Sequence, residues 1–256
     1  MAIVKEERIG NQRLILGDCL EIMPNLKPFG HVICDPPYEA KLHQSKNSLR
    51  KTKRVDLGPD LKGLNFEPID AIRDKFVASA DKCCVGWFIA FCTVEGVWKW
   101  SEEINSSSMK YKRACIWIKP DSTPQLNGQC PAQGAECFVT AWCGSGHSRW
   151  NAGGKRGVYR HIVNPSDRHG DHPTEKPWRL FAEILHDFTQ SNETILDPFM
   201  GSGTTLVACQ KLGRKGTGIE LDPDYFEVAC KRVDEASRQP DLFVKNPTKA
   251  KQGSMI

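Results

Sequence analysis

The segment Val32-Ile33-Cys34-Asp35-Pro36-Pro37-Tyr38 is a short apolar run that two prolines bring to an end. Its β-branched residues predict a buried strand over 32–34. Proline lacks a backbone N–H and pushes the preceding residue into an extended conformation, so the strand must stop there. An acid, a carbonyl oxygen and an aromatic ring then follow the strand, at the edge where open α/β sheets bind ligands. The alternative is an ordinary turn that happens to contain Asp35 and Tyr38.

The length and composition fit one large α/β domain or two small ones. The chain has 256 residues, 39% of them hydrophobic, and a net charge of +4 that does not by itself indicate a nucleic-acid partner. The N-terminus does not resemble a signal peptide, and no apolar run reaches the length of a membrane span. With eleven cysteines, mostly in apolar runs, these features predict a cytoplasmic protein with free thiols and no membrane contact.

The cysteines do not predict a metal site. Zinc sites use closely spaced pairs such as C-x2-C. The nearest group, Cys137, Cys143 and His147, lacks that spacing. We therefore expect no bound metal.

Strand and helix patterns alternate along most of the chain. Expected strands lie at 14–16, 32–34, 83–91, 194–196 and 215–219, and 113–118 and 136–142 are expected to pair as a hairpin. Six helices are expected between and after these strands. One covers 20–26, one begins at Val94, Val97 and Trp98, one ends at Gly213 and one is capped by Asp222. The other two show apolar faces, formed by Ile69, Ile72, Phe76, Val77 and Ala80 and by Leu180, Phe181, Ile184, Leu185 and Phe188. This order predicts a Rossmann-like α/β sheet, mostly parallel with one antiparallel hairpin strand, and helices on both faces.

Two segments are basic and poor in aliphatic residues. The first spans 40–55 and the second spans 144–171, where aromatic rings are interleaved. Basic groups suit phosphate contacts and aromatic rings suit base stacking, so both segments predict contact with a nucleic acid. Solvated surface loops are the alternative. The residues concerned are Lys41, Lys46, Arg50, Lys51, Lys53 and Arg54 in the first segment, and Arg149, Trp150, Lys155, Arg156, Tyr159, Arg160 and Arg168 in the second.

A second acid ends a strand late in the chain, in Asp197-Pro198-Phe199-Met200-Gly201-Ser202-Gly203-Thr204-Thr205. Its glycines let the backbone approach a ligand closely, and the following helix start offers free N–H groups. Glu220 ends the next strand, where an acid suits the two hydroxyls of a ribose. The pattern is neither G-x-G-x-x-G nor the phosphate loop. An adenosine joined to an amino acid would therefore fit.

Together, the segments from Asp35 and from Asp197 resemble the amino-directed DNA methyltransferases that use S-adenosylmethionine. Because the catalytic segment comes first, a basic region follows and the cofactor turn comes last, the chain is similar to the β group of N6-adenine and N4-cytosine enzymes, to about Ala236. The resemblance implies one domain with a catalytic half (1–143), a target-recognition insert (144–171), a cofactor-binding half (172–237) and a flexible tail (238–256).

The resemblance also implies roles for individual residues. The methionine part of the cofactor would contact Asp197, Phe199, Gly201, Ser202, Gly203 and Thr204. Glu220 would bind the ribose of the cofactor, and Asp18 with the neighbouring Cys19 would bind its adenine. Thr174 and Lys176 would bind the carboxylate of its methionine part. Taken alone, Asp18 is a turn acid and Lys176 a surface lysine.

In such an enzyme, Asp35, Pro36, Pro37 and Tyr38 form the catalytic segment. The Asp35 carboxylate and the Pro36 carbonyl would each accept an N–H of an exocyclic amine, and Tyr38 would stack on a flipped base. Asp in the first position of this segment goes with adenine in the family, which favours N6-adenine in double-stranded DNA. Cytosine-N4 methylation, RNA adenine methylation and a non-catalytic nucleic-acid-binding protein remain alternatives.

The tail adds a possible protein partner. Residues 239–243, Gln-Pro-Asp-Leu-Phe, resemble the short peptides with which bacterial proteins bind the replication sliding clamp. The alternative is that these residues fold back on the core. A partner restriction endonuclease and a homodimer are both left open by the sequence.

Overall fold

The computed structural model describes residues 3–37, 69–122, 129, 131–163 and 176–238. Several predicted features lie outside the described residues. These are Tyr38, the basic segment over 40–55, Arg168, Thr174 and the tail from Gln239 onward.

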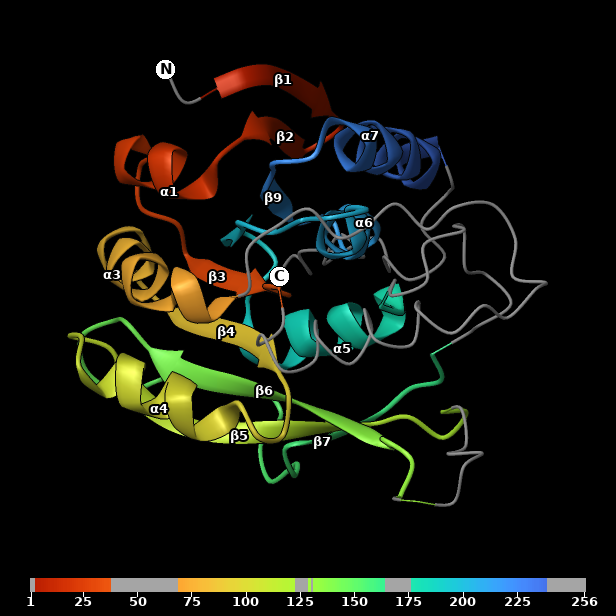
Figure 1. Ribbon diagram of the computed structural model, residues 1–256. Helices are drawn as coiled ribbons and strands as arrows, with labels where there is room; N and C mark the ends of the chain where they lie inside the picture. Colours follow the sequence, from red (N-terminus) through yellow and green to blue (C-terminus); the bar gives the residue numbers. More distant parts are fainter. Residues whose placement is uncertain (1–2, 38–68, 123–128, 130, 164–175, 239–256) are drawn as a thin grey trace, which may run out of the picture.

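Within the described residues, nine strands form one mixed sheet in the order β1-β2-β9-β8-β3-β4-β6-β5-β7 (Figure 1). The five strands from β2 to β4 in this order run parallel, β1 is an antiparallel edge strand, and β6 runs antiparallel to both β4 and β5. The predicted mostly parallel sheet with an antiparallel hairpin is confirmed. The bounds are β1 Ile3–Ile9, β2 Gln12–Gly17, β3 His31–Cys34, β4 Trp87–Cys92, β5 Lys110–Ile118, β6 Ala135–Trp142, β7 Val158–Arg160, β8 Thr194–Asp197 and β9 Lys215–Glu220.

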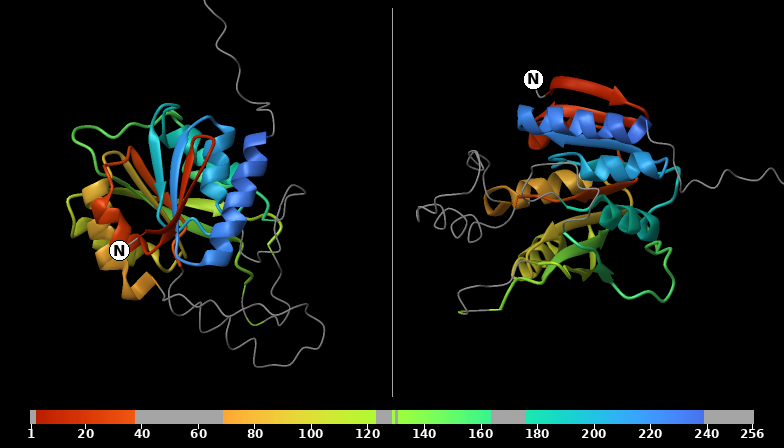
Figure 2. Two further views of the ribbon diagram at one scale, coloured as in Figure 1. Left: turned by 90° about the horizontal axis from the view of Figure 1, so that it is seen from above. Right: turned by 90° about the vertical axis from the view of Figure 1, so that its right-hand side faces the viewer.

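Helices cover both faces of this sheet, as Figure 2 shows in the view from above. One face packs against α1 (Cys19–Ile22), α3 (Arg73–Cys83) and α4 (Val97–Asn105), with the short turns η1 (Met23–Asn25) and η2 (Ile69–Ala71) beside them. The other face packs against α5 (Trp178–Phe188), α6 (Thr204–Lys211) and α7 (Pro223–Arg238). Across the residues that the structure describes, no helix has the length and apolar character needed to cross a membrane.

Aromatic side chains anchor the helices to each face. The ring centroid of Phe76 of α3 lies 5.9 Å from that of Phe88 of β4, and both side chains are fully buried. On the other face, the ring centroid of Phe181 of α5 lies 5.2 Å from that of Phe91 of β4. Such ring pairs stabilise a core beyond the area they bury. The apolar faces predicted for α3 and α5 are therefore the ones that hold these helices on the sheet.

Several elements differ from the sequence prediction. β1 was not predicted, the helix expected over 20–26 is α1 followed by η1, and α4 begins at Val97 instead of Val94. The strand expected from Cys83 begins only at Trp87, because α3 continues to Cys83 and the Cys84 N–H closes its last turn on the Ala80 carbonyl. The sequence predicts no strand in the segment over 144–171, but β7 lies within it and extends the sheet beside β5. Tyr159 of β7 is fully buried and donates to Asp187 Oδ2 at 2.9 Å. The suggestion that Tyr159 stacks on a base is therefore wrong.

Candidate active site

The two key acids leave the sheet at the same edge, on neighbouring strands. β3 pairs in parallel with β8, with His31 opposite Ile195 and Val32 opposite Leu196. Asp35 follows β3 and Asp197 is the last residue of β8, so both carboxylates stand at the carboxyl ends of adjacent strands. The sheet thus brings together two segments that are more than 150 residues apart in the sequence.

Two further acids extend this row. The strand order β2-β9-β8-β3 places Glu220, the last residue of β9, next to Asp197, and Asp18 follows β2 on the other side. Leu16 of β2 pairs with Glu220, so Asp18 lies two residues beyond that pair. Asp18 Oδ1 accepts from the Leu20 N–H at 2.8 Å and caps α1. Four acids from four strands therefore line one edge of the sheet.

The turn after Asp197 is built around two glycines with positive φ angles. Gly201 has φ +51° and open space where a side chain would begin, whereas a Cβ on Gly203 (φ +81°) would lie 3.0 Å from Ala229 Cβ. The Gly201 N–H donates to Glu220 Oε2 at 2.8 Å, and the Asp222 N–H donates to Glu220 Oε1 at 2.8 Å. The turn is thus tied to the end of β9 and leaves room beside Gly201 for a ligand.

Arg232 of α7 holds the same turn from behind and was not predicted from the sequence. Its Nη1 donates to the Ser202 carbonyl and hydroxyl, both at 2.6 Å, and lies 3.3 Å from Thr204 Oγ1. All three residues are buried. The side chains of Ser202 and Thr204 therefore face α7.

Burial sets the electrostatics of this row of acids. Asp197 is 2% exposed, and burial raises the pKa of its carboxyl to about 7, with the nearby Asp35 and Glu220 carboxylates adding to the effect. Hydrogen bonds from the Thr205 side chain and the Phe199 N–H act in the opposite direction. Burial also raises the pKa of Glu220. A cation bound here would favour the ionised form of Asp197.

Lys176 reaches Asp35, in the predicted catalytic segment, directly. Its buried ammonium donates to Asp35 Oδ2 at 2.5 Å and lies 3.4 Å from Glu136 Oε2. Burial lowers the pKa of Lys176, but Asp35 and Glu136 outweigh burial, so the pKa is raised. The sequence led us to expect a cofactor carboxylate as its partner, and in the structure its acidic partners include the carboxylates of the protein itself.

The basic residues of the second segment divide into two groups. Lys155 is ion-paired with Glu183 and Asp187, and Arg149 is ion-paired with Glu193. Arg156 and Arg160 are exposed, and the interleaved Trp150 ring packs against Phe188. Arg160 ends β7, which runs parallel to β5 and so ends at the same edge as the acids.

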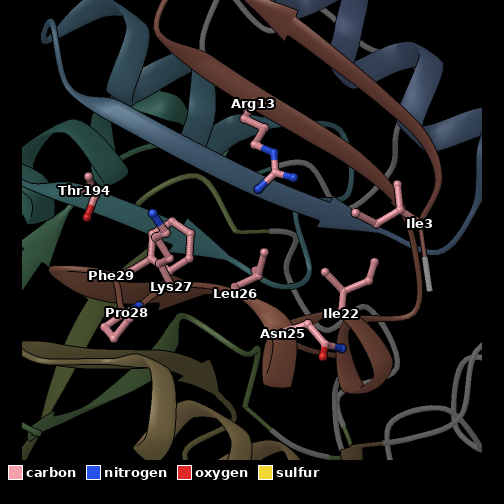
Figure 3. Close-up of a pocket in the computed structure, with 9 residues that line it drawn as sticks. All are labelled: Ile3, Arg13, Ile22, Asn25, Leu26, Lys27, Pro28, Phe29 and Thr194. Atoms are coloured by element: carbon pink, nitrogen blue, oxygen red, sulfur yellow. The ribbon is translucent and has the colours of Figure 1, made fainter. Parts of the chain in front are cut away.

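A separate hollow of about 720 Å³ lies beside α1 and η1 (Figure 3). Its lining includes Ile22, Leu26 and Phe29, with Arg13 and Thr194 at the starts of β2 and β8. Asp18 and Asp197 lie at the opposite ends of these two strands. The hollow is therefore distinct from the row of acids.

Known proteins with similar sequences identify the family of this chain. A family model described as DNA methylase, covering N6 and N4 methyltransferases, matches residues 29–231. The chain belongs to this DNA methylase family. A similar relative of the DNA methylase is the Type II methyltransferase M2.LlaDCHI of Lactococcus lactis subsp. cremoris, 25% identical over 244 residues, which are 89% of this chain and 91% of that protein.

Solved structures share the fold of this DNA methylase. The crystal structure of the M1.HpyAVI–SAM complex superposes with a TM-score of 0.67 at 22% identity, covering 87% of this chain and 99% of that chain. The PvuII DNA methyltransferase, described as cytosine-N4-specific, gives a TM-score of 0.68 at 16% identity, covering 90% and 89%. At these identities the likeness establishes the fold alone.

Proposed function

We propose that this DNA methylase transfers a methyl group from S-adenosylmethionine to the exocyclic N6 amino group of adenine in double-stranded DNA. The observation that carries the proposal is the parallel pairing of β3 with β8. This pairing places the segment Asp35-Pro36-Pro37 and the glycine turn after Asp197 at the same edge of the sheet. One strand end can thus hold the amine while its neighbour holds the cofactor.

The described residues fit S-adenosylmethionine. Both Glu220 oxygens accept a backbone N–H, and each retains a lone pair for a ribose hydroxyl. The open space at Gly201 allows a ligand to approach the backbone, and Asp197 suits a neighbouring positive charge. When bound, the cofactor supplies a methyl group that is activated by its sulfonium. The M1.HpyAVI protein, which has a similar fold and was crystallised as a complex with SAM, supports the same cofactor here.

The catalytic segment suits an amine that is a weak nucleophile. The nitrogen lone pair of a base amine is delocalised into the ring, and two acceptors on its N–H groups direct it outward. Asp35 and the carbonyl of Pro36 supply these acceptors, which also stabilise the positive charge that develops on the nitrogen. Holding the amine in line with the methyl group contributes much of the rate acceleration in a displacement of this kind. A paired base cannot reach a sheet edge, so we propose that the base is flipped.

The choice of adenine rests on the family preference for Asp35 with adenine. Cytosine-N4 is the second candidate, because cytosine presents the same kind of amino group and the PvuII enzyme, which has a similar fold, is named as cytosine-N4-specific. We propose that Arg156 and Arg160, with the basic segment over 40–55, contact the DNA backbone. The proposed clamp peptide at 239–243 is a separate interaction, and Leu242→Ala with Phe243→Ala should abolish a clamp pull-down.

The proposed reaction is tested by incubating the protein with S-adenosylmethionine labelled in the methyl group and duplex DNA, followed by digestion to nucleosides. We expect label in N6-methyladenine, no label with RNA of the same sequence, and none with Asp35→Ala. The Asp35→Ala variant should still bind the cofactor. Label in N4-methylcytosine would favour the second candidate, and no transfer by the unsubstituted protein would overturn the proposal.

A further inference from the structure

A chain of alternating charges leads from the end of β5 to Asp35. Lys119 Nζ lies 2.8 Å from Glu136 Oε1, Glu136 Oε2 lies 3.4 Å from Lys176 Nζ, and Lys176 Nζ lies 2.5 Å from Asp35 Oδ2. The side chains of Lys119, Glu136 and Lys176 are only 11%, 13% and 6% exposed. Their formal charges, with that of Asp35, cancel. Buried charges of this kind persist only when they are paired.

The sheet topology brings these residues together. Glu136 belongs to β6, where it pairs with Trp117 of β5, and Lys119 follows β5. Because β6 runs antiparallel to β4, its start lies at the edge where β3 and β4 end. Lys176 enters from the segment before α5. The charge chain thus joins the antiparallel hairpin to the catalytic segment, which no local sequence pattern reveals.

Lys176 holds one oxygen of the proposed catalytic carboxylate. Its ammonium is hydrogen-bonded to Asp35 Oδ2 but not to Oδ1, and its positive charge weakens the whole carboxylate as an acceptor for a substrate amine. The carboxylate of Glu136 lies 3.4 Å from the same nitrogen. Charged N–H···O bonds are usually about 2.7–2.9 Å long, so a movement of roughly half an ångström would complete a bond from Lys176 to Glu136. The ammonium can change partners without ever being buried alone.

We infer that Glu136 is a positioning residue that takes over the Lys176 ammonium and so releases Asp35 for the amino group of the substrate. Lys119, bonded to the other oxygen of Glu136, orients that carboxylate for the exchange. This inference rests on the proposed function. It assigns a role in the reaction to the antiparallel hairpin, through Glu136, although Glu136 itself does not touch the substrate.

The inference is tested with Glu136→Gln, which keeps the shape of the side chain and removes its charge. Turnover at saturating DNA and cofactor should fall about 10- to 100-fold, since the competing acceptor for the ammonium is weakened. The Kd for S-adenosylmethionine, measured by calorimetry, should stay within about threefold of the original value. Glu136→Asp should restore part of the turnover. Glu102→Gln, on the exposed surface of α4, is the matched control and should match the unsubstituted protein.

A double variant separates partner exchange from simple charge balance. Lys119→Gln combined with Glu136→Gln restores the charge balance but not the second acceptor, so turnover should remain low. Recovery of turnover in the double variant would overturn the inference, as would unchanged turnover in Glu136→Gln. A parallel loss of cofactor affinity and thermal stability would also overturn it, because the role would then be structural. If the unsubstituted protein transfers no methyl group, the proposed function fails and the inference fails with it.

Discussion

Cofactor binding should release a proton from Asp197. Burial and the neighbouring carboxylates raise the pKa of this group to about 7. S-adenosylmethionine carries an ammonium and a sulfonium, and positive charge beside a carboxylate favours its ionised form. A group with this pKa is about 90% protonated at pH 6 and about 10% protonated at pH 8. Because the proton must leave before the ionised form is populated, the Kd should be roughly tenfold weaker at pH 6 than at pH 8.

Calorimetric titrations at pH 6, 7 and 8 measure this coupling. In two buffers that differ in ionisation enthalpy, about half a proton should be released per bound cofactor near pH 7. Asp197→Asn is the control, because it cannot titrate and it corrects for protons that come from the cofactor or from other groups. Asp197 does not release the proton if the Kd of the unsubstituted protein is the same at all three pH values, or if Asp197→Asn shows the same tenfold change.

Further predictions concern stability and DNA binding. The pKa of Asp197 in the folded protein lies above its unfolded value near 3.8. The free energy of unfolding should therefore fall by roughly 4 kcal/mol as pH rises from about 4 to 7. Urea titrations at each pH measure this fall, and Asp197→Asn should lack it. Gly203→Ala should destabilise the protein by about 2–3 kcal/mol, because the new side chain meets both backbone strain and crowding. Gly213→Ala, at φ +64° with open space around it, should destabilise the protein by only about 1 kcal/mol. Equal losses of stability in urea unfolding would show that crowding at Gly203 contributes nothing. Arg160→Gln should lower the slope of log K against log salt for DNA binding by about 1. Lys155→Gln should leave that slope unchanged and lower stability by about 1–3 kcal/mol, because its partners are acids of the protein; the reverse pattern would place Lys155 on the DNA.

The row of acids was predictable because each acid follows a local signal. Asp35 and Asp197 follow short apolar strands that prolines terminate, and Glu220 precedes the cap and proline that start α7. Strand ends of this kind gather at one edge of a parallel sheet whatever the intervening segments do. The sequence was therefore sufficient for the sheet type and for the position of the two central segments.

The contacts that connect these segments were not predictable in the same way. Arg232 lies in a helix segment rich in charged residues, where nothing distinguishes a buried arginine from an exposed one. Glu136 meets Lys176 only because β6 is inserted between β4 and β5, an order that local patterns do not specify. The strand containing Tyr159 has three residues and glycine before it, too short a run to show alternation. These failures arise from long-range pairing, not from misread residue types.

In the proposed reaction, the ends of β3 and β8 hold the amine and the cofactor against each other. A structure of the protein bound to duplex DNA and a non-reactive S-adenosylmethionine analogue would show this arrangement. We expect a flipped adenine whose N6 lies about 2.7–3.2 Å from both the Asp35 carboxylate and the Pro36 carbonyl oxygen, in line with the transferable methyl group. We also expect Lys176 to have moved toward Glu136. A base bound away from Asp35, or a cofactor bound away from Asp197 and Glu220, would contradict this arrangement.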